Sequence, residues 1–299
     1  MAIPSFAKQH DNPDGNPEQE STPRRWVQRF NRNRMAVGSV VVLILIVLSA
    51  VAAPVLSPYR PNNMNLQLSY APLGTPGHLL GTNALGEDIL SRLLYGGRVS
   101  LFVALSAATV STFIGVTCGA LAGFYGGWLD TILMRFVDLM LSIPDLFILL
   151  VLASYTGLNE VTMIFFIGAF SWMGTARIVR GVFLSVRETP MVEAAQALGA
   201  SGVRIMVRYL IPSAIGPITV ALTFAVARSM LLEASLDFLG FGISPSIPTW
   251  GNMLVSAQQA LGIQPWAVVA PGLMITLTVL SLNFIGDGIR EIWDSEGSA

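Results

Sequence analysis

Charged side chains inside apolar stretches are the first candidates for chemistry in this 299-residue chain. Arg135 and Asp138 lie three positions apart, and Arg228, Glu233 and Asp237 occupy one later stretch. Ionisable groups in apolar surroundings are costly, so they are usually paired or functional. A spacing of three predicts an ion pair between Arg135 and Asp138 on one helix face. Arg228 and Glu233 do not share a face, so we expect partners on other helices, lining of a polar path, or a proton or ion relay.

Residue types that could support catalysis by this chain alone are scarce. Lys8 is the only lysine, and it lies in the polar N-terminal tail. A P-loop requires a lysine after its second glycine, so the chain cannot bind ATP in that way. His10 and His78 lie far from each other and Cys118 is the single cysteine. The sequence therefore predicts no catalytic residue, no metal site, no internal disulfide and no cofactor of its own.

The most distinctive segment is the basic, glycine-containing stretch 188–212. Pro190 suits a helix start, and Glu193 in the first turn faces the positive end of the helix dipole. Gly199 can adopt the left-handed conformation that ends such a helix. We expect a second short helix to run to Ile211, with Pro212 in the first turn of the next long helix. The simplest interpretation is an amphipathic hairpin that only connects two longer helices.

The composition shows which elements must position these residues. The chain is 53% hydrophobic and only 12% charged, with a mean hydropathy of +0.63. Soluble domains carry about 25% charged residues, and a membrane-spanning helix needs about 20 apolar ones. The apolar runs predict an all-α membrane protein with six spans, at 36–56, 100–124, 131–154, 161–178, 212–236 and 268–285. A cleavable signal peptide is the alternative for 36–56, although its preceding tail and apolar run are long for one.

Arginines mark one side of this topology. Five arginines precede the first span, and Arg187, Arg204, Arg208 and Arg290 fall on the same side. Because cytoplasmic loops are enriched in positive charge, both termini are predicted to be cytoplasmic. The predicted segments are a mostly disordered tail 1–35, the first span 36–56, a periplasmic segment 57–99, a five-helix core 100–287 and a C-terminus 288–299. The core includes a cytoplasmic loop 187–211 and a periplasmic loop 240–267.

Three glycines on the second span form two overlapping steps of four residues. Gly115, Gly119 and Gly123 place small residues along one helix face. Such faces let helix backbones approach closely. We favour packing within the chain over a dedicated dimer contact.

The spacing within 188–212 then points to a family. Glu-Ala-Ala, three residues, Gly, nine residues, an apolar residue, one more, an aliphatic residue and Pro together resemble the EAA motif of ABC importer permeases. The matching positions are Glu193, Ala194, Ala195, Gly199, Tyr209, Ile211 and Pro212. In that family the loop is a coupling helix that docks on an ATPase subunit. The resemblance implies this coupling role for the seven residues.

Further stretches resemble the C-type permeases of dipeptide and oligopeptide importers. These are residues 81–101, residues 233–251 and residues 283–290. The resemblance covers about residues 25–294. It implies a type I ABC importer permease fold in the bacterial inner membrane, forming half of a path for di- or oligopeptides. The implied partners are a B-type permease in a heterodimer, two ATP-binding subunits that carry the ATP, the Mg and the ATPase activity, a periplasmic substrate-binding protein and the lipid bilayer, with no nucleic acid.

Three alternatives follow from the same residues. Within the family, the substrate could be nickel, glutathione or an oligosaccharide. From another class, a secondary transporter could use Arg228, Glu233 and Asp237, but it would have no use for the loop from Glu193 to Pro212. A non-transporting scaffold is the third, and it would show no ATP-dependent uptake. The sequence does not identify substrate-binding residues.

Overall fold

The computed structural model describes residue 30, residues 33–157 and residues 159–294. Most of the predicted N-terminal tail, which would precede the apolar run of a signal peptide, lies outside this part of the chain, as do the last five residues. Within the described part, regular secondary structure is helical, and extended pairing is limited to isolated bridges at Thr75–His78 and Thr82–Asp88. The predicted helical class is confirmed.

The helices differ greatly in length. The long ones are α2 (Arg34–Val51), α4 (Ile89–Tyr125), α11 (Ile211–Phe238) and α13 (Trp266–Asp294). Those of intermediate length are α5 (Gly127–Leu141), α6 (Asp145–Thr156), α7 (Glu160–Phe170), α8 (Met173–Arg187) and α12 (Trp250–Gln258). The short ones are α3 (Ala53–Leu56), η1 (Leu66–Leu68), α9 (Pro190–Ala197), α10 (Gly202–Ile205) and the π-helical turn η2 (Met206–Leu210).

Four of the described helices are long and apolar enough to cross a membrane unaided. These are α2, α4, α11 with the α10 and η2 turns that precede it, and α13. Two further candidates are broken helices. The α5–α6 pair bends by 79° and the α7–α8 pair by 42°, and counting each as one span gives six. The predicted spans at 131–154 and 161–178 are therefore interrupted where a continuous helix was expected.

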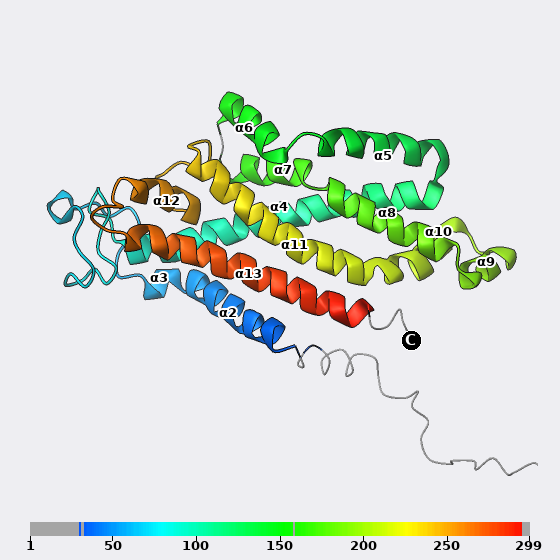
Figure 1. Cartoon of the computed structure of the whole chain (residues 1–299), viewed down its shortest axis with the longest axis horizontal. Coiled ribbons are helices and arrows are strands. Elements are labelled where there is room, and N and C mark those ends of the chain that lie inside the picture. Colours follow the sequence, from blue (N-terminus) through cyan, green and yellow to red (C-terminus); the bar gives the residue numbers. More distant parts are fainter. Residues whose placement is uncertain (1–29, 31–32, 158, 295–299) are drawn as a thin grey trace, which may run out of the picture.

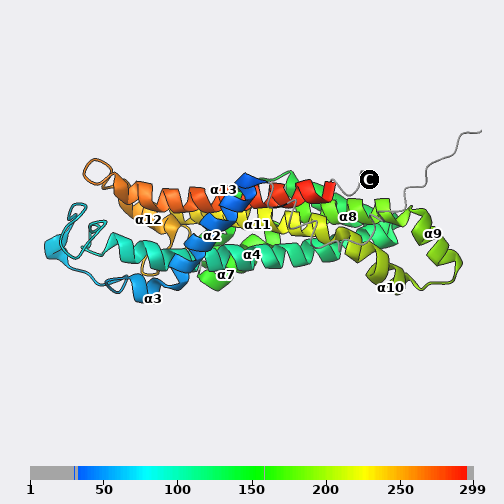
Figure 2. The ribbon, with the colours of Figure 1, turned by 90° about the horizontal axis from the view of Figure 1, so that it is seen from below.

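The helices form an elongated bundle along one axis (Figure 1). α4, α11 and α13 run along the axis of the bundle, while α2 crosses it obliquely in the view of Figure 2. α4 packs most extensively on α8, α11 and α7, and α13 packs on α11 and α2. Residues 57–88 and 239–265 lie at one end, which we call the long-loop end, and α9 and α10 lie at the other.

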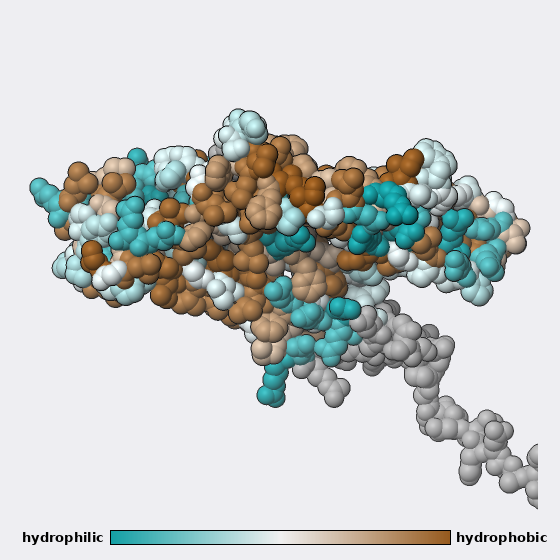
Figure 3. All heavy atoms as spheres, turned by 45° about the horizontal axis from the view of Figure 1, so that its top comes forward, coloured by the Kyte–Doolittle hydropathy of each residue, from teal (hydrophilic) through white to brown (hydrophobic). Residues whose placement is uncertain are grey.

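Surface hydropathy follows this axis. In Figure 3, hydrophobic side chains cover much of the middle of the visible face, and hydrophilic ones are more frequent towards the two ends. Several large hydrophobic side chains of the long helices are exposed, among them Phe113, Phe102 and Leu45, at 73%, 61% and 61%. A lipid environment accommodates such side chains without cost, as a membrane protein requires.

The second span begins earlier than hydropathy predicts. α4 starts at Ile89, eleven residues before the predicted boundary at residue 100, and Asp88 caps it by accepting from the backbone N–H of Ser91 at 2.7 Å. Arg92 thus lies inside the helix. Its guanidinium donates to Glu87 at 2.8 Å and to the carbonyl of Pro245 at 3.0 Å. Because loops bury this charge, the helix can extend beyond its apolar run.

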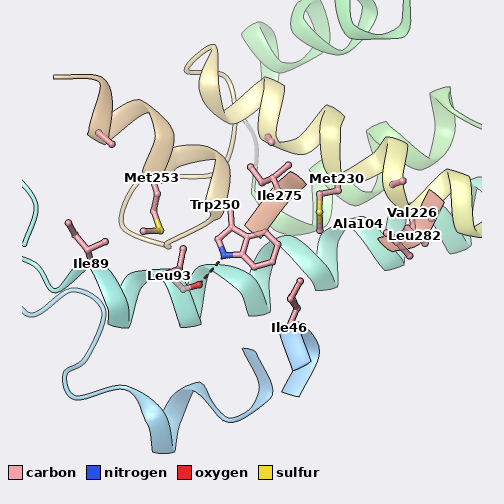
Figure 4. Close-up of a cluster of buried hydrophobic side chains, with 14 of the residues drawn as sticks. Ile46, Ile89, Leu93, Ala104, Val226, Met230, Trp250, Met253, Ile275 and Leu282 are labelled. Atoms are coloured by element: carbon pink, nitrogen blue, oxygen red, sulfur yellow. Dashed lines mark hydrogen bonds between the residues drawn. The ribbon is translucent and has the colours of Figure 1, made fainter. Parts of the chain in front are cut away.

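The main core joins α4, α11, α12 and α13 around Trp250, which is fully buried (Figure 4). The indole Nε1 donates to the carbonyl of Leu93 on α4 at 3.0 Å. This bond fixes α12 to α4, and the buried hydrogen bond removes the cost of placing a polar indole nitrogen in an apolar core. Residues 248–253 are thereby buried at the end of the bundle, while residues 239–241 and 244–246 remain at the surface.

The three glycines of the second span lie against α8. A Cβ atom added at Gly115, Gly119 or Gly123 would come within 3.0 Å of a Cβ atom of Thr175, Val179 or Phe183, respectively. Only the absence of a side chain permits this approach, and it lets α4 and α8 pack backbone against side chain along their shared length. The glycine face is occupied within the chain.

Candidate functional sites

The α9 helix begins and ends as the sequence indicates. Thr189 is its N-cap residue, Pro190 occupies the first turn, and Glu193 lies in the same turn with an exposed side chain. The end is a Schellman arrangement. Ala200 N–H donates to the carbonyl of Ala195 and Gly199 N–H donates to that of Gln196, at 3.0 and 2.9 Å. Gly199 has a φ of +79°, the left-handed conformation that glycine adopts without strain.

The α9–α10 hairpin has a buried face and an exposed face. Val192, Ile205 and Leu210 are buried against Val179 and Phe183 of α8, so the hairpin is anchored to the bundle. On the outside, large apolar side chains remain exposed: Leu198 at 89%, Val203 at 72%, Val207 at 58% and Met191 at 56%. The exposed charges Glu193, Arg204 and Arg208 lie among them. An apolar surface with a charged margin on a rigid support is typical of a protein contact site.

The motif residues are divided between these two faces. Ala195 is buried, Tyr209 is half-buried in the anchoring cluster, and Glu193, Ala194, Gly199, Ile211 and Pro212 are exposed. The expected boundary before Pro212 is absent. The helical backbone continues from Gly202 through the π-helical turn into α11, which makes one 37-residue helix to Phe238. The hairpin's second arm is therefore the end of a long helix.

A row of acid–arginine pairs joins α5–α6 to the helices beside them. Asp130 accepts two bonds from Arg180 of α8, at 2.5 and 2.6 Å, and Asp138 pairs with Arg177 of α8. Asp145, at the start of α6, accepts from Nη2 and Nε of Arg228 on α11 at 2.7 and 3.2 Å. These three pairs hold the broken span to its neighbours.

The predicted pair between Arg135 and Asp138 is wrong in its partner. Asp138 is bound by Arg177, which lies 39 positions away in sequence on the facing helix α8. Arg135 is exposed and has no hydrogen-bond partner among the described residues. An arginine on a facing helix can replace the local arginine as the partner of Asp138, because its planar guanidinium donates to a carboxylate across the interface between the helices. The prediction that Arg228 has its partner on another helix agrees with the observed pair.

Glu233 and Asp237 lie in a buried network at the long-loop end. Ser100 of α4 donates to Glu233 Oε1 at 2.9 Å and accepts from the backbone N–H of Trp250 at 3.1 Å. Asp237 accepts from Thr249 Oγ1 and, at 2.7 Å, from the N–H of Ile243. The two carboxylates thus fix the segment 243–250 to α4 and α11. Oε2 of Glu233 is buried without a hydrogen-bond partner among the described residues. The bonds of Oε1 and of Asp237 nevertheless favour a structural role for the two groups over a relay.

Four members of the charged pairs were not among the predicted site residues: Asp130, Asp145, Arg177 and Arg180. A signal was present in the sequence, because Asp130, Asp138 and Asp145 recur at intervals of eight and seven. That spacing places them near one helix face, two turns apart. Among the described residues, no three or more His, Cys, Asp or Glu side chains lie close enough together to hold a metal ion.

Comparison with known proteins decides the family. The model for "Binding-protein-dependent transport system inner membrane component" matches residues 115–296, and that for "N-terminal TM domain of oligopeptide transport permease C" matches residues 22–72. The chain belongs to this family of inner-membrane transport components. It is a multi-pass permease of the ABC importer type, as the resemblance of its motifs implies.

Relatives cover nearly the whole chain. A putative peptide permease protein of Brucella suis is 38% identical over 273 residues, which are 90% of each chain. The oligopeptide transport system permease proteins OppC of Haemophilus influenzae and Mycobacterium tuberculosis are each 36% identical and cover 89% and 90% of this chain, and 86% and 92% of their own length.

A solved structure gives the fold. The chain is similar to one in the inward-facing MetNI methionine ABC transporter, with a TM-score of 0.52 and 19% sequence identity. The match covers 67% of this chain and 95% of the other. At this identity the similarity shows a shared permease fold and nothing of the substrate.

Proposed function

We propose that the chain is the C-type permease subunit of a bacterial peptide ABC importer and forms half of the path across the inner membrane. The observation that carries the proposal is the anchored α9–α10 hairpin, with its exposed apolar side chains and its continuous connection to α11. A partner that moves the hairpin would move a membrane-spanning helix with it. Relatives named as peptide permeases support the substrate class.

The proposed assembly has six spans, with both termini and the hairpin on the cytoplasmic side. A B-type permease completes the path, two ATP-binding subunits dock on the hairpins, and a periplasmic binding protein delivers the substrate. ATP, Mg and the ATPase activity belong to those partner subunits, and this chain is not an enzyme in the proposal. The roles of Glu193, Ala194, Ala195, Gly199, Tyr209, Ile211 and Pro212 are to form and position the docking surface.

Reconstitution tests this proposal. The complete set of subunits in liposomes, with the binding protein outside and ATP inside, should take up radiolabelled dipeptide. Omission of the ATPases should abolish uptake. Equal uptake by this chain alone would instead support a secondary transporter, and a complete complex that moves no peptide would contradict the proposal. Titration of the binding protein with peptides, nickel, glutathione and oligosaccharides then distinguishes the substrates within the family.

A further inference from the structure

The bend between α5 and α6 exposes irregular backbone in the middle of a span. The two helices meet at 79° across Ser142, Ile143 and Pro144, and all three residues are exposed. Along α5, Leu141 lies about 21 Å from Gly127 at a rise of 1.5 Å per residue, well inside a hydrocarbon layer of about 30 Å. Non-helical backbone at such a depth occurs where protein covers it or where it lines a water-filled cavity. The surface at this bend therefore does not face lipid.

Charged side chains at the same place lead to the same conclusion. Arg228 lies ten residues before the end of α11, about 15 Å along the helix, and its side chain is 57% exposed. Arg177 and Asp138 are 48% and 49% exposed. Exposure of such groups to hydrocarbon is costly. In Figure 1, α5 and α6 lie along one edge of the bundle, and Figure 3 shows hydrophilic side chains interrupting the hydrophobic middle. This edge therefore faces protein or water and not lipid, and the thiol labelling described below decides whether water reaches it.

The contact between Arg228 and Asp145 leaves binding capacity unused. Two of the three donor nitrogens of Arg228, Nε and Nη2, reach the same oxygen, Oδ2 of Asp145. The other oxygen, Oδ1, accepts from the N–H of Leu146 at 3.0 Å. The guanidinium therefore keeps its other edge for a second acceptor, and a carboxylate is the group that matches that geometry. The Arg228 side chain is 57% exposed and the Asp145 side chain is 17% exposed, so water reaches this pair mainly from the arginine side. An ion pair in contact with water contributes little to stability, so the free-energy cost of exchanging its charges for those of a substrate is small.

We propose that Arg228 and Asp145 form a contact site in the transport path for the opposite charges of a zwitterionic substrate, such as a short peptide. Arg228 receives the carboxylate and Asp145 receives the ammonium group. The inference rests on the proposed importer function and adds a substrate contact to it. The buried pair of Arg92 and Glu87, whose side chains are 6% and 3% exposed, shows the contrasting case of a pair with no access for a substrate.

Charge exchange distinguishes this site from a structural ion pair. Arg228→Gln and Asp145→Asn are measured in the complete complex in liposomes, with radiolabelled dialanine, the binding protein and ATP. Each should lower initial uptake about tenfold, the loss expected for one charged hydrogen bond. The double variant Arg228→Asp with Asp145→Arg restores an ion pair but reverses its polarity, and uptake should stay low. Recovery to the wild-type rate would overturn the proposal.

The pair of Arg180 and Asp130 provides the matched control, because its charges likewise join the α5–α6 span to a neighbouring helix, which is α8 instead of α11. The corresponding exchange, Arg180→Asp with Asp130→Arg, should support uptake near the wild-type rate. Assembly with the partner subunits is measured for every variant. The proposed function fails if the wild-type complex transports no peptide, whereas this inference fails if that complex transports and the Arg228→Gln variant equals it.

Thiol labelling tests the water-accessible face independently of charge. In a background with Cys118→Ala, Ile143→Cys at the bend is compared with Leu45→Cys on α2, where both native side chains are exposed, at 45% and 61%. A membrane-impermeant methanethiosulfonate should modify the complex at position 143 and not at position 45. Dialanine with its binding protein and ATP should slow that modification. Absence of labelling at position 143 in every nucleotide state would contradict the proposal.

Discussion

At the scale of single residues, the glycines of α4 show how small a group decides the packing of two spans. At Gly119 an added Cβ would lie 2.9 Å from Cβ of Val179, with the backbone of Ala176 also in contact. A leucine gains about 1 kcal/mol of helix propensity over glycine, but overpacking typically costs about 1–3 kcal/mol even where side chains can move. Backbone cannot move so easily, so the clash should dominate.

Gly119→Leu should therefore lower the melting temperature and the yield of the detergent-solubilised permease. Gly181→Leu, on the facing helix α8, is the matched control, because no atom lies within 4 Å of its added Cβ. That variant should be as stable as the native chain or slightly more so. Fluorescence-detected size-exclusion chromatography after heating measures both, and equal behaviour of the two variants would refute the packing argument.

The sequence does not predict which charged residues pair with each other. Arg135 and Asp138 have a suitable local spacing, yet Asp138 binds Arg177, thirty-nine positions away. Local spacing limits only contacts within one helix, whereas the choice between helices depends on their packing. Likewise Glu233 and Asp237 were identified as unusual, but their bonds to Ser100 and Thr249 follow from the way segment 243–250 folds back.

At the scale of elements, the apolar runs predict the number and place of candidate spans well, because hydropathy is a local property. They do not predict the ends of α4 or the breaks at residues 142–144 and 171–172. The start of α4 at Ile89 depends on loops that bury Arg92. At the first break the backbone N–H groups of Ser142 and Ile143 donate to carbonyls of α5 itself. Pro144 gave a local signal for the first break, since proline disfavours helical geometry in the residue before it.

The α9–α10 hairpin allows a prediction about its turn. Gly199 has a φ of +79° and no atom within 4 Å of an added Cβ, so backbone conformation and not space restricts this position. Valine disfavours that conformation strongly, by about 1–2 kcal/mol or more, whereas asparagine adopts it comparatively readily. Gly199→Val should thus reduce ATP-dependent uptake severely, and Gly199→Asn should retain much of it, with the chain inserted in both cases.

Uptake by the complete complex in liposomes measures the difference, and the amount of ATPase retained on the purified permease reports docking. Equal losses in the valine and asparagine variants would show that the site requires an uncovered surface at Gly199 and would contradict the conformational explanation. Glu193→Lys complements the pair, because it reverses an exposed charge without changing the backbone. It should lower ATPase retention while leaving membrane insertion intact.

At the scale of the whole molecule, the broken pairs decide the topology. If α5–α6 and α7–α8 are each one span, the chain crosses six times, and Gly157 lies on the same side as the long-loop end. If both pairs are re-entrant, the chain crosses four times, and Gly157 lies on the side of the α9–α10 hairpin. Both arrangements place the two termini on one side, so labelling of the termini cannot separate them.

A cysteine at Gly157 separates the two arrangements. In the Cys118→Ala background, Gly157→Cys should react in intact cells with a reagent that does not cross the inner membrane, as should a Leu73→Cys control at the long-loop end. Leu198→Cys, on the hairpin, should react only after the membrane is opened. Gly157 has a φ of +62°, so a short cysteine-containing insertion after it serves as a second probe that avoids backbone strain. Six spans are contradicted if both probes at 157 behave like Leu198→Cys. The expected result would place the α5–α6 bend, with Arg228 and Asp145, within the membrane and between its two faces, which is the position that a substrate contact in a transport path requires.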